Sequence, residues 1–426
     1  MGRNVLVVGG GGREHALAWR LAASSSVDAV ESTPGNPGTA AIGRTHDIDV
    51  EDPAAVAELA ERRGADLVVI GPEAPLVAGV ADELLRRDIP VFGPTADGAR
   101  IEGSKAFAKE VMAAAGVPTA GYVATADREE AQTALERSAP PYVVKADGLA
   151  AGKGVSICDT LPEAREAVDD LLVRRRFGDA GDRVVIEEFL HGPEVSVFGV
   201  CDGEDVVLLS PAQDFKRAED GDAGPNTGGM GAFTPVPGFG LPDAGELSGL
   251  VFRPVLRELA ARGTPYRGVL YAGLVLTDGG PKLLEFNARF GDPETQIVLR
   301  RLGSDLGDLL AAAATGRVRD VRVRWHDDAF VGIVLASGGY PGAYRTGLPI
   351  TGVDEADARE GVKVFHAGTA RAGDGTLVTS GGRVLNVTGR GATIADAREV
   401  AYEAADRIRW DGLHRREDIA LTASRA

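Results

Sequence analysis

Cysteine is nearly absent from this sequence, because its 426 residues include only Cys158 and Cys201. Two cysteines provide neither a disulfide framework nor a metal cluster, and this scarcity fits a reducing compartment. The sequence also lacks any apolar run that approaches the roughly 20 residues of a membrane span. Its first residues, MGRNVLVVGGGG, show no signal-peptide pattern. We therefore expect a cytoplasmic protein that does not bind a membrane.

Positive charge is also in deficit, with 46 lysines and arginines against 63 acidic residues and a net charge of −17. Such a surface repels nucleic acid and anionic membranes, so we expect neither as a partner. An anionic small substrate remains compatible, because it needs only a local cationic pocket. Lysine is the rarer base, with seven residues of which the first is Lys105. The lysines are therefore candidates for sites that need a compact ammonium group.

The sequence predicts an α/β fold in several domains. Strand and helix patterns alternate in residues 1–103, which favours a Rossmann-like, doubly wound parallel sheet. Residues 104–325 contain a small mixed unit at about 120–190, followed by the strands of a larger sheet. Residues 326–426 predict a small mixed α/β C-terminal domain that closes with a helix. This division fits one domain per roughly 150 residues.

A stretch rich in glycine and lysine, VVKADGLAAGKGVSI, joins two predicted strands and therefore forms a hairpin loop. Glycines let backbone N–H groups close on phosphate oxygens, and lysine adds a point charge. The lysines are Lys145 and Lys153, and the glycines are Gly148, Gly152 and Gly154. The loop is not a Walker motif, because no Gly-Lys-Ser/Thr opens a helix here. A flexible hairpin tip is the alternative interpretation.

The stretch RVVIEEFLHGPE places Glu187 and Glu188 at the end of an apolar strand, with Glu194 shortly after them. A strand with a free edge can bind an adenine through its backbone groups. A nearby carboxylate can accept hydrogen bonds from ribose hydroxyls. Taken alone, the same stretch is more typical of a solvated strand end.

A third stretch, LLEFNARFGDPETQ, begins as a buried strand and then becomes polar. Period-two alternation puts Glu285, Asn287 and Arg289 on one face and apolar residues on the other. Buried charge is costly unless it is paired, so this face does not build a core. Glu285 and Asn287 are oxygen donors suited to Mg²⁺ shared with nucleotide phosphates. Arg289 suits a transferring phosphoryl group or a carboxylate. A solvated sheet edge is the alternative.

In this order and spacing, the three stretches resemble the ATP-grasp superfamily, with a lysine strand and glycine lid, a hinge strand with Glu, and Glu-x-Asn-x-Arg. Further motifs resemble the phosphoribosylamine–glycine ligase family from the first strand to the last helix. They are GGGGREHALAW, PGNPGTA, GPEAPLV, FGPTADGARIEGSKAF, KADGLAAGKGV, QDFKR, GPNTGGMGAFTP, YAGL, EFNARFGDPETQ and GGYPGAYRTG. The resemblance implies that residues 104–325 form an ATP-grasp body whose lid, at about 120–190, is mobile.

The resemblance also implies where ATP and a metal ion bind. The expected metal ligands for Mg²⁺ or Mn²⁺ are Glu285 and Asn287, and the expected catalytic residues are Arg289, Lys145 and Asp292. Many relatives have another carboxylate one strand earlier, but GVLYAGLVLTDGG has no acidic residue before Asp278. The expected ATP-binding residues are Lys105, Lys145, Gly148, Gly152, Lys153, Gly154, Glu187, Glu188, Leu190 and Glu194.

Glycine and 5-phosphoribosylamine are the substrates that the resemblance implies. The family often has His where this chain has Phe215, so a proton-transfer role there is not carried over. Residues 220–231, taken alone, are more typical of a disordered acidic loop. The start of the first helix can receive a phosphate. The expected substrate-binding residues are Gly10, Gly11, Gly12, Arg13, Asp214, Lys216, Asn226, Gly228, Gly229 and Arg289.

The implied activity is a carbon–nitrogen ligation in the second step of purine biosynthesis. ATP converts glycine to glycyl phosphate, and the amine of 5-phosphoribosylamine then displaces phosphate to form glycinamide ribonucleotide. Positioning and charge neutralisation supply most of the catalysis, so no nucleophile–base pair is needed. We expect the chain to act as a monomer.

Three other functions stay open. VVGGGGREH after a strand, with Glu31 near the distance of a ribose ligand, favours a nicotinamide-dependent dehydrogenase. However, Glu14 occupies the place of the third glycine of that fingerprint. Another ATP-grasp ligase would share the ATP site but use a different acid or amine. A non-catalytic nucleotide-binding protein would not require the set of Glu285, Asn287 and Arg289.

Overall fold

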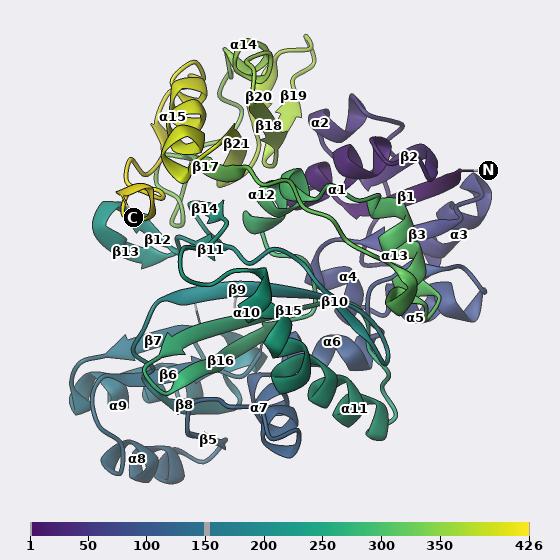
Figure 1. Cartoon of the computed structure of the whole chain (residues 1–426). Helices are drawn as coiled ribbons and strands as arrows, with labels where there is room; N and C mark the ends of the chain where they lie inside the picture. Colours follow the sequence, from purple (N-terminus) through teal and green to yellow (C-terminus); the bar gives the residue numbers. More distant parts are fainter. Residues whose placement is uncertain (1, 149–153, 426) are drawn as a thin grey trace.

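The computed structural model describes residues 2–148 and 154–425. In Figure 1 the N-terminal elements lie at the right, the elements of the predicted lid at the lower left and the C-terminal elements at the top. The long strands of the body lie between them. The candidate site is built where these parts meet.

The N-terminal part forms the parallel sheet that the sequence predicts, with strand order β2-β1-β3-β4. Residues 5–8 of β1 are fully buried, as expected for a strand covered by helices on both faces. Gly9 turns the chain from β1 into α1 with φ of +126°, a conformation that favours glycine. The strands are β1 (Arg3–Gly9), β2 (Val27–Pro34), β3 (Leu67–Ile70) and β4 (Val91–Phe92). The helices are α1 (Gly12–Ala22), α2 (Pro37–Ala40), α3 (Pro53–Arg63), α4 (Glu73–Val77), α5 (Val80–Arg86) and α6 (Ala96–Gly103).

The lid is an antiparallel sheet with strand order β5-β8-β6-β7, and its β6–β7 pair confirms the predicted hairpin. Helices cover one face and bury residues such as Leu135, Val144 and Ile186 in a hydrophobic cluster that belongs to the lid alone. The lid therefore packs as its own unit. Its elements are β5 (Tyr122–Thr125), α8 (Arg128–Glu136), β6 (Tyr142–Ala146), β7 (Val155–Cys158), α9 (Leu161–Leu172), η1 (Gly178–Gly181) and β8 (Val184–Glu188).

The body contains a second antiparallel sheet, with strand order β10-β9-β15-β16. It shares a continuous hydrophobic core with the N-terminal sheet, in which Leu6 and Val68 join Leu270 and Phe286. These two parts therefore form one base beneath the lid. The strands are β9 (Glu194–Asp202), β10 (Val206–Leu208), β15 (Arg267–Thr277) and β16 (Gly280–Asn287). The helices around them are α7 (Lys105–Ala114), α10 (Leu241–Leu247), η3 (Ser248–Phe252), α11 (Arg253–Ala261), α12 (Glu294–Arg301), α13 (Leu306–Ala314) and η4 (Val318–Asp320).

The C-terminal sheet includes two strands from the middle of the chain, which strand order along the sequence did not indicate. Its order is β11-β14-β17-β21-β18, with β22 paired to β17. The long strands are β17 (Ala329–Ser337), β18 (Val362–His366) and β21 (Arg383–Gly391), and the strands from the middle are β11 (Gln213–Asp214) and β14 (Gly231–Thr234). The other elements are β12 (Arg217–Glu219), η2 (Asp220–Asp222), β13 (Ala223–Asn226), α14 (Val353–Asp357), β19 (Thr369–Arg371), β20 (Leu377–Thr379), α15 (Ile394–Ala405), β22 (Leu413–His414) and η5 (Ala423–Arg425).

Two histidines join the N-terminal and C-terminal parts. His15 on α1 is buried, and its Nδ1 accepts a hydrogen bond of 2.8 Å from the backbone N–H of His366. The two rings lie 5.6 Å apart. Burial lowers the pKa of His15 well below its usual value, and burial together with Lys363 lowers the pKa of His366 to about 4. Both rings are therefore neutral in the folded protein at neutral pH.

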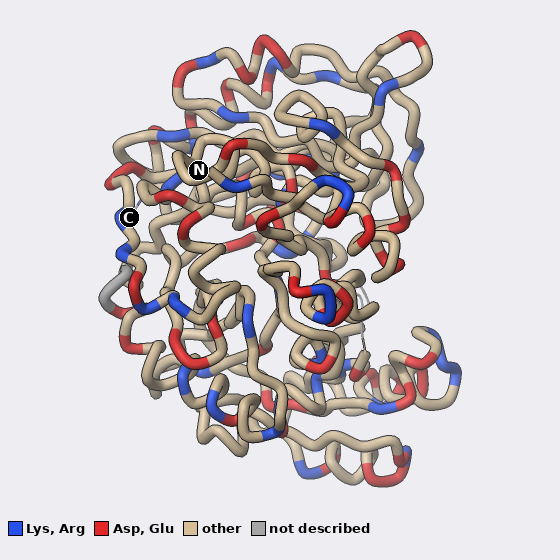
Figure 2. The backbone as a smooth tube through the Cα atoms, turned by 90° about the vertical axis from the view of Figure 1, so that its right-hand side faces the viewer, with Lys and Arg blue, Asp and Glu red and all other residues tan. Residues whose placement is uncertain are grey.

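Charged residues of both signs occur along all parts of the chain (Figure 2). The described helices include none with the length and apolar character needed to cross a membrane.

The contact between His15 and His366 predicts that the protein loses stability in acid. Because the folded pKa of His366 lies below its unfolded value of 6.5, its contribution is present above that value and is lost as the pH falls toward 4. We expect this group to cost about 2 kcal/mol of unfolding free energy between pH 7 and pH 5. Chemical denaturation should show a flatter pH dependence for His366→Gln. Exposed His191, changed to Gln, is the control and should keep the wild-type slope.

Candidate active site

The polar strand that carries Glu285, Asn287 and Arg289 is β16 with its extension, and the structure confirms its alternation. Phe286, Ala288 and Phe290 are buried, whereas Glu285 and Asn287 are partly exposed. Glu285 lies opposite Gly273 of β15, whose missing side chain leaves room above the sheet. Among the described residues, the side chains of Glu285 and Asn287 have no hydrogen-bond or ion-pair partner. Their oxygens are thus available on one face of the sheet.

Cations from several segments surround Glu285. Burial raises the pKa of this carboxyl group, but the positive groups outweigh burial and the net shift is downward. The carboxylate therefore stays ionised near neutral pH. The cations that lower its pKa are Lys216, Lys145, Lys105 and Arg289.

A buried ion cluster joins the lid to helix α7. Glu187 on β8 lies 3.0 Å from Lys145 Nζ through Oε1 and 3.1 Å from Lys109 Nζ through Oε2. All three residues are at most 3% exposed. Lys109 also donates a 2.7 Å hydrogen bond to Thr119 Oγ1, which in turn donates to the backbone of Leu283 in β16. The cluster thus connects both sheets that border the predicted ATP site.

The first turn of α7 is fixed to the root of the glycine loop. The Oδ1 atom of Asp147 accepts hydrogen bonds from Ser104 Oγ and from the backbone N–H of Ala106. Lys105 Nζ donates to the carbonyl of Gly148 at 3.2 Å. Burial lowers the pKa of Lys105. Gly148 packs so closely on η1 that a Cβ atom would lie 2.7 Å from the Cα of Ala180.

Part of the glycine loop lies outside the described residues. Gly152 and Lys153, both expected to bind phosphate, belong to that part. Gly154 is described, and its carbonyl accepts a hydrogen bond from the backbone of Ala146.

The lid sheet adds an apolar surface beside the ion cluster. Val143 is the strand partner of both Ile157 and Glu187, so these side chains share one face with Lys145. Ile157 is 50% exposed, which leaves an apolar surface that can contact a planar base. Among the expected adenine and ribose ligands, Glu188 is exposed, and Leu190 lies in a small hydrophobic cluster at the foot of the lid.

An acidic group surrounds Lys216, which is one of the cations that lower the pKa of Glu285. Glu194 pairs with Lys216 at 2.5 Å. Burial raises the pKa of Asp214 to about 7, with Glu294 and Glu194 acting in the same direction and Lys216 opposing them. Glu294 is buried and accepts a 2.9 Å hydrogen bond from Tyr271 Oη. This cluster of acidic side chains therefore suits a positively charged group.

Arg289 is fixed by carboxylates of the N-terminal part. Its Nη2 lies 3.0 Å from Glu102 Oε1, and its Nε lies 3.5 Å from Glu73 Oε2. Although burial disfavours the charged form, the two carboxylates raise the pKa of Arg289 further. Glu102 Oε2 also accepts the backbone N–H of Ala288 at 2.7 Å, which fixes the end of the polar strand.

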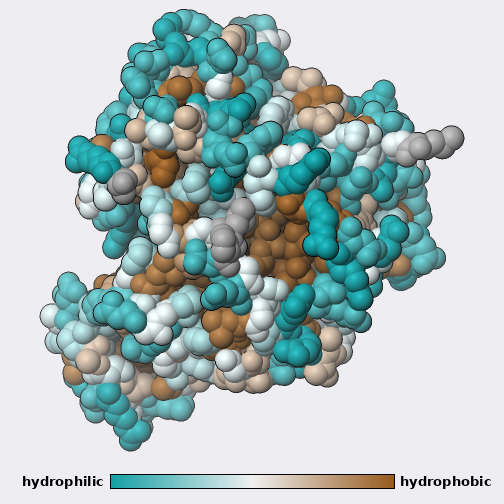
Figure 3. Space-filling view, in the orientation of Figure 1, coloured by the Kyte–Doolittle hydropathy of each residue, from teal (hydrophilic) through white to brown (hydrophobic). Residues whose placement is uncertain are grey.

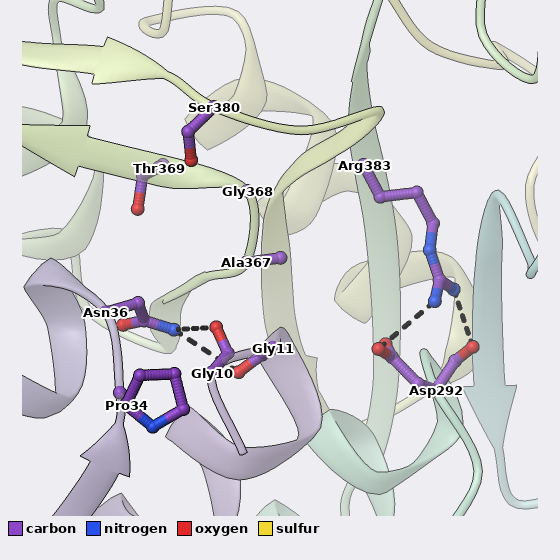
Figure 4. Close-up of a pocket in the computed structure, with 11 residues that line it drawn as sticks. Gly10, Gly11, Pro34, Asn36, Asp292, Ala367, Gly368, Thr369, Ser380 and Arg383 are labelled. Atoms are coloured by element: carbon purple, nitrogen blue, oxygen red, sulfur yellow. Dashed lines mark hydrogen bonds and ion pairs between the residues drawn. The ribbon is translucent and has the colours of Figure 1, made fainter. Parts of the chain in front are cut away.

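A separate cavity of about 420 Å³ lies between the start of α1 and the C-terminal sheet. Figure 4 shows Asn36 beside Gly10 and Gly11 on one side and Arg383 reaching Asp292 on the other. Asn36 Nδ2 donates to the carbonyls of Gly10 and His366, both at 2.9 Å, and so joins the two walls. The lining residues are Gly10, Gly11, Pro34, Gly35, Asn36, Asp292, Ala367, Gly368, Thr369, Ser380 and Arg383.

Arg383 organises one wall of this cavity. It donates to the carbonyl of Asp292 at 2.6 Å, pairs with its Oδ2 at 3.1 Å and donates to the carbonyl of Gly228 at 2.6 Å. Arg383 and Arg13 overcome the effect of burial and lower the pKa of Asp292. Gly229 lies against Pro293, where a Cβ atom would come within 2.4 Å. The structure thus brings Gly228 and Gly229, two of the predicted substrate-binding residues, together with Asp292.

Other predicted residues have structural partners in the described protein. Arg13 is buried, with Nε 2.5 Å from Glu14 Oε1 and Nη1 donating to the carbonyl of Phe290. Asn226 pairs with Arg217 in the β12–β13 hairpin. A Cβ atom on Gly12 would lie 2.8 Å from Gln296 Nε2, so this glycine allows α1 and α12 to approach.

Sequence reasoning missed Lys109, Glu73, Glu102, Asn36 and Arg383. Lys109 had a usable signal, because it follows Lys105 by four residues and so shares its helix face. Glu73 and Asn36 lie inside motifs that carried the resemblance, but their partners are far away in sequence. Nothing local marks Arg383, whose partners lie 91 and 155 residues away.

The dinucleotide interpretation has no support in the geometry. Glu31, its expected ribose ligand, is occupied by a bidentate ion pair with Arg63 and a 2.6 Å contact with His46. Glu14, at the place of the third glycine, instead accepts the N–H of Gly11 at 2.7 Å and caps α1.

Comparisons with known proteins agree over the whole chain. The N, ATP-grasp (A) and C domain models of phosphoribosylglycinamide synthetase match residues 3–102, 103–295 and 330–422. A phosphoribosylamine–glycine ligase of Streptomyces coelicolor is 53% identical over 99% of this chain and 100% of its own. One from Mesorhizobium japonicum is 49% identical over 97% of each chain.

Solved structures give the same result. The crystal structure of phosphoribosylamine–glycine ligase from Thermotoga maritima has a TM-score of 0.83 and 37% identity, over 98% of this chain and 100% of that one. The biotin carboxylase domain of Hydrogenobacter thermophilus 2-oxoglutarate carboxylase, in complex with MgADP and bicarbonate, has a TM-score of 0.74. It is 17% identical and covers 97% of this chain and 91% of that chain, so it shares the fold.

The ion cluster predicts that Glu187 is needed for stability as well as for ATP binding. Glu187→Gln leaves two buried ammonium groups without a counter-charge, which should cost about 3–5 kcal/mol of unfolding free energy. Chemical denaturation and calorimetric titration with ATP would measure both effects. Glu188→Gln, at an exposed neighbour, should change stability by less than about 0.5 kcal/mol. A Glu187→Gln protein as stable as the wild type would contradict the role of the cluster.

Proposed function

The chain belongs to the phosphoribosylglycinamide synthetase family, and we propose that the residues described above carry out the reaction of that family. The protein is an ATP-dependent carbon–nitrogen ligase of purine biosynthesis. It joins glycine to 5-phosphoribosylamine and releases glycinamide ribonucleotide, ADP and phosphate. The observation that carries the residue assignment is that Glu285 and Asn287 have no partner among the described residues, while four cations lower the pKa of Glu285.

ATP binds between the lid sheet and β16. The adenine lies against the apolar face near Ile157, with the strand end at Glu187, Glu188 and Leu190 beside it. Lys105 and Lys145 neutralise the phosphates, because both ammonium groups act on the same side of the cleft as Glu285. The glycine loop, including Gly148, Gly152, Lys153 and Gly154, covers the phosphates, and Glu194 contacts the ribose.

Glu285 and Asn287 fit a divalent cation. Their oxygens have no partner among the described residues, and the surrounding cations keep Glu285 ionised. Mg²⁺ is commonly held by one or two protein oxygens together with substrate phosphates, and Mn²⁺ accepts the same donors. When bound, the ion would neutralise charge on the transferring phosphoryl group.

Glycine binds with its ammonium group near acidic side chains and its carboxylate near cationic ones. Its ammonium group faces Asp214 and Glu294, two acids beside the single cation Lys216. Its carboxylate faces Arg289 and Lys145. These cations bring the carboxylate to the γ-phosphoryl group of ATP, because like charges could not otherwise approach. The carboxylate oxygen attacks phosphorus, ADP leaves, and glycyl phosphate forms.

The cavity at the start of α1 binds 5-phosphoribosylamine. The phosphate lies beside Gly10, Gly11 and Gly12, where the positive end of the α1 dipole favours an anion, and Arg383 supplies a positive charge at the opposite wall. Asp292 is held ionised by Arg383, so its carboxylate accepts an N–H of the substrate amine and orients its lone pair. The amine attacks the acyl carbon, and phosphate departs with the bridging oxygen.

Water must be excluded while the acyl phosphate exists. The lid has its own hydrophobic cluster and is joined to the body at the Glu187 ion cluster, so closure can occur by rotation about that root. In Figure 3 the lower lobe, which contains the lid, is set off from the upper part by an indentation at the left edge.

The remaining assignments follow from the same arrangement. We propose domain limits of 1–103, 104–325 and 326–426, with the lid at about 120–190. We also propose that the protein acts as a monomer. Its two buried cysteines are unpaired, which supports a reducing cytoplasm.

Turnover with defined substrates tests the assignment. Purified protein is given ATP, Mg²⁺, glycine and freshly generated 5-phosphoribosylamine, with each omitted in turn. We expect ADP release to require all four and the amide product to have the mass of glycinamide ribonucleotide. Release with a different acid or amine would keep the ATP site and reject the proposed glycine and phosphoribosylamine sites.

Changing the metal ligands should abolish turnover while leaving the fold intact. Because Glu285 has no partner among the described residues, Glu285→Gln should lower kcat at least about 100-fold and raise the Mg²⁺ requirement. The matched control is Asp278→Asn in the exposed turn of the same hairpin. Unchanged turnover and Mg²⁺ dependence in Glu285→Gln would reject the metal assignment.

Changing Arg383 should affect the second substrate selectively. Charge-assisted hydrogen bonds are worth about 1.5–3 kcal/mol, so Arg383→Ala should raise KM for 5-phosphoribosylamine by about tenfold or more. The KM for ATP should change little. Arg390→Ala, on the same strand with its partner Asp328 partly exposed, is the control. An equal rise in both KM values would argue against Arg383 as a phosphate ligand.

A further inference from the structure

The segment that follows the last helix returns to the middle of the chain. Residues 414–418 lie against the β12–β13 hairpin, almost 200 residues away in sequence. His414 Nε2 contacts the carbonyl of Ala218 at 2.8 Å. The backbone N–H of Glu417 donates to Asp220 Oδ1, and the N–H of Gly221 donates to Asp418 Oδ2, both at 2.8 Å. The two segments are thus joined at several points.

Arg416 is the centre of this contact. It is 1% exposed, and in the part of the chain that the structure describes it is one of the largest fully buried side chains. Its guanidinium binds both oxygens of Asp418, at 2.7 and 2.8 Å. It also donates to Asp222 Oδ1 at 2.7 Å and to the carbonyl of Arg217 at 3.2 Å. Its charge lies 5.0 Å above the ring of Phe215.

These contacts bracket Lys216. Phe215 precedes it and Arg217 follows it, and Arg416 touches both. The carbonyl of Lys216 also accepts hydrogen bonds from the N–H and the hydroxyl of Thr227, at 2.7 and 2.9 Å. Thr227 leads directly into a second glycine-rich loop, residues 227–229. The carbonyl of Gly228 in this loop accepts a hydrogen bond from Arg383. The position of Lys216 is therefore coupled to the position of that loop.

The hairpin has little to stabilise it by itself. Its strands are three and four residues long, and such a pair is at best marginally stable in water. Residues 219–225 are exposed, and they include Glu219, Asp220 and Asp222. Without a buried cation, these carboxylates and that of Asp418 would repel one another. Arg416 supplies that cation, and this explains why the acidic stretch 220–231 is an ordered hairpin and loop.

We propose that Arg416 is a positioning residue of the ligase, which holds Lys216 and the glycine loop at 227–229 in the geometry that binds glycine and 5-phosphoribosylamine. This inference rests on the proposed function for the identity of the bound molecules. Arg416 touches no substrate in this scheme. It acts through the ring of Phe215, the backbone at Arg217 and the carboxylate of Asp222.

The test compares Arg416→Ala and Arg416→Lys with the control Arg415→Ala. Arg415 is the adjacent arginine, and its partners Asp406 and Glu417 lie within the C-terminal part. Hydrogen exchange is measured at the amides of Gly221, Thr227 and Met230, with those of α15 as the internal reference. Steady-state KM values are measured for glycine, 5-phosphoribosylamine and ATP. Turnover of Arg416→Ala is also measured with millimolar guanidinium chloride.

We expect Arg416→Ala to exchange faster at the hairpin amides but not in α15, and to raise KM for glycine and 5-phosphoribosylamine by about tenfold. The KM for ATP should change less than about twofold. Guanidinium should restore part of the activity, because it can refill the vacated site, whereas at millimolar concentration it would leave a protein that was merely unstable unchanged. Arg416→Lys should lie between, since lysine keeps the charge but loses the bidentate geometry.

Other results would overturn the inference. Unchanged hairpin exchange in Arg416→Ala would show that Arg416 does not order this segment. Faster exchange with unchanged KM values, or an equal rise in all three, would show that it does not position the substrate loop. If the wild type itself fails to use glycine and 5-phosphoribosylamine, the proposed function fails. Hydrogen exchange then still decides whether Arg416 holds Lys216 and the loop.

Discussion

The proposed ATP site depends on one carboxylate, Glu187, placed between two buried ammonium groups. Removing charges from water is costly, and burial is tolerated only when the charges compensate one another closely. Lys145 and Glu187 belong to the lid, whereas Lys109 belongs to α7 of the body. The same three charges therefore offset the cost of one another's burial and join the lid to the body. Because the lid keeps its own hydrophobic cluster, its root is fixed while the rest can move as a unit.

The other half of the site follows the same rule across longer distances. The chain carries a net charge of −17, yet four of the six lysines that the structure describes interact with Glu285 or Glu187. Carboxylates from the N-terminal part bind Arg289. Arg383 from the C-terminal sheet binds Asp292 and the loop at 227–229. Each part of the fold thus supplies one side of an ion pair whose other side belongs to a different part.

Local patterns predicted much of this arrangement, because strand alternation and helix periodicity depend only on neighbouring residues. The polar face of Glu285 and Asn287, the β6–β7 hairpin and the parallel N-terminal sheet were all predicted and are confirmed. The missed residues share a different property: they act through partners far along the chain. Arg383 binds Gly228, and Arg416 orders an acidic hairpin that by composition is equally typical of disorder. Likewise, the entry of β11 and β14 into the C-terminal sheet depends on topology that no local pattern encodes.

The reaction scheme is tested most directly by following the oxygen atoms of glycine. Glycine labelled with oxygen-18 in its carboxylate is turned over with ATP, Mg²⁺ and 5-phosphoribosylamine, and the released phosphate is analysed by mass spectrometry. If the carboxylate between Arg289 and Lys145 attacks the γ-phosphoryl group, each phosphate should carry one labelled oxygen from glycine. Phosphate without label, formed at the same rate as the amide product, would contradict activation through glycyl phosphate and the placement of glycine in this cleft.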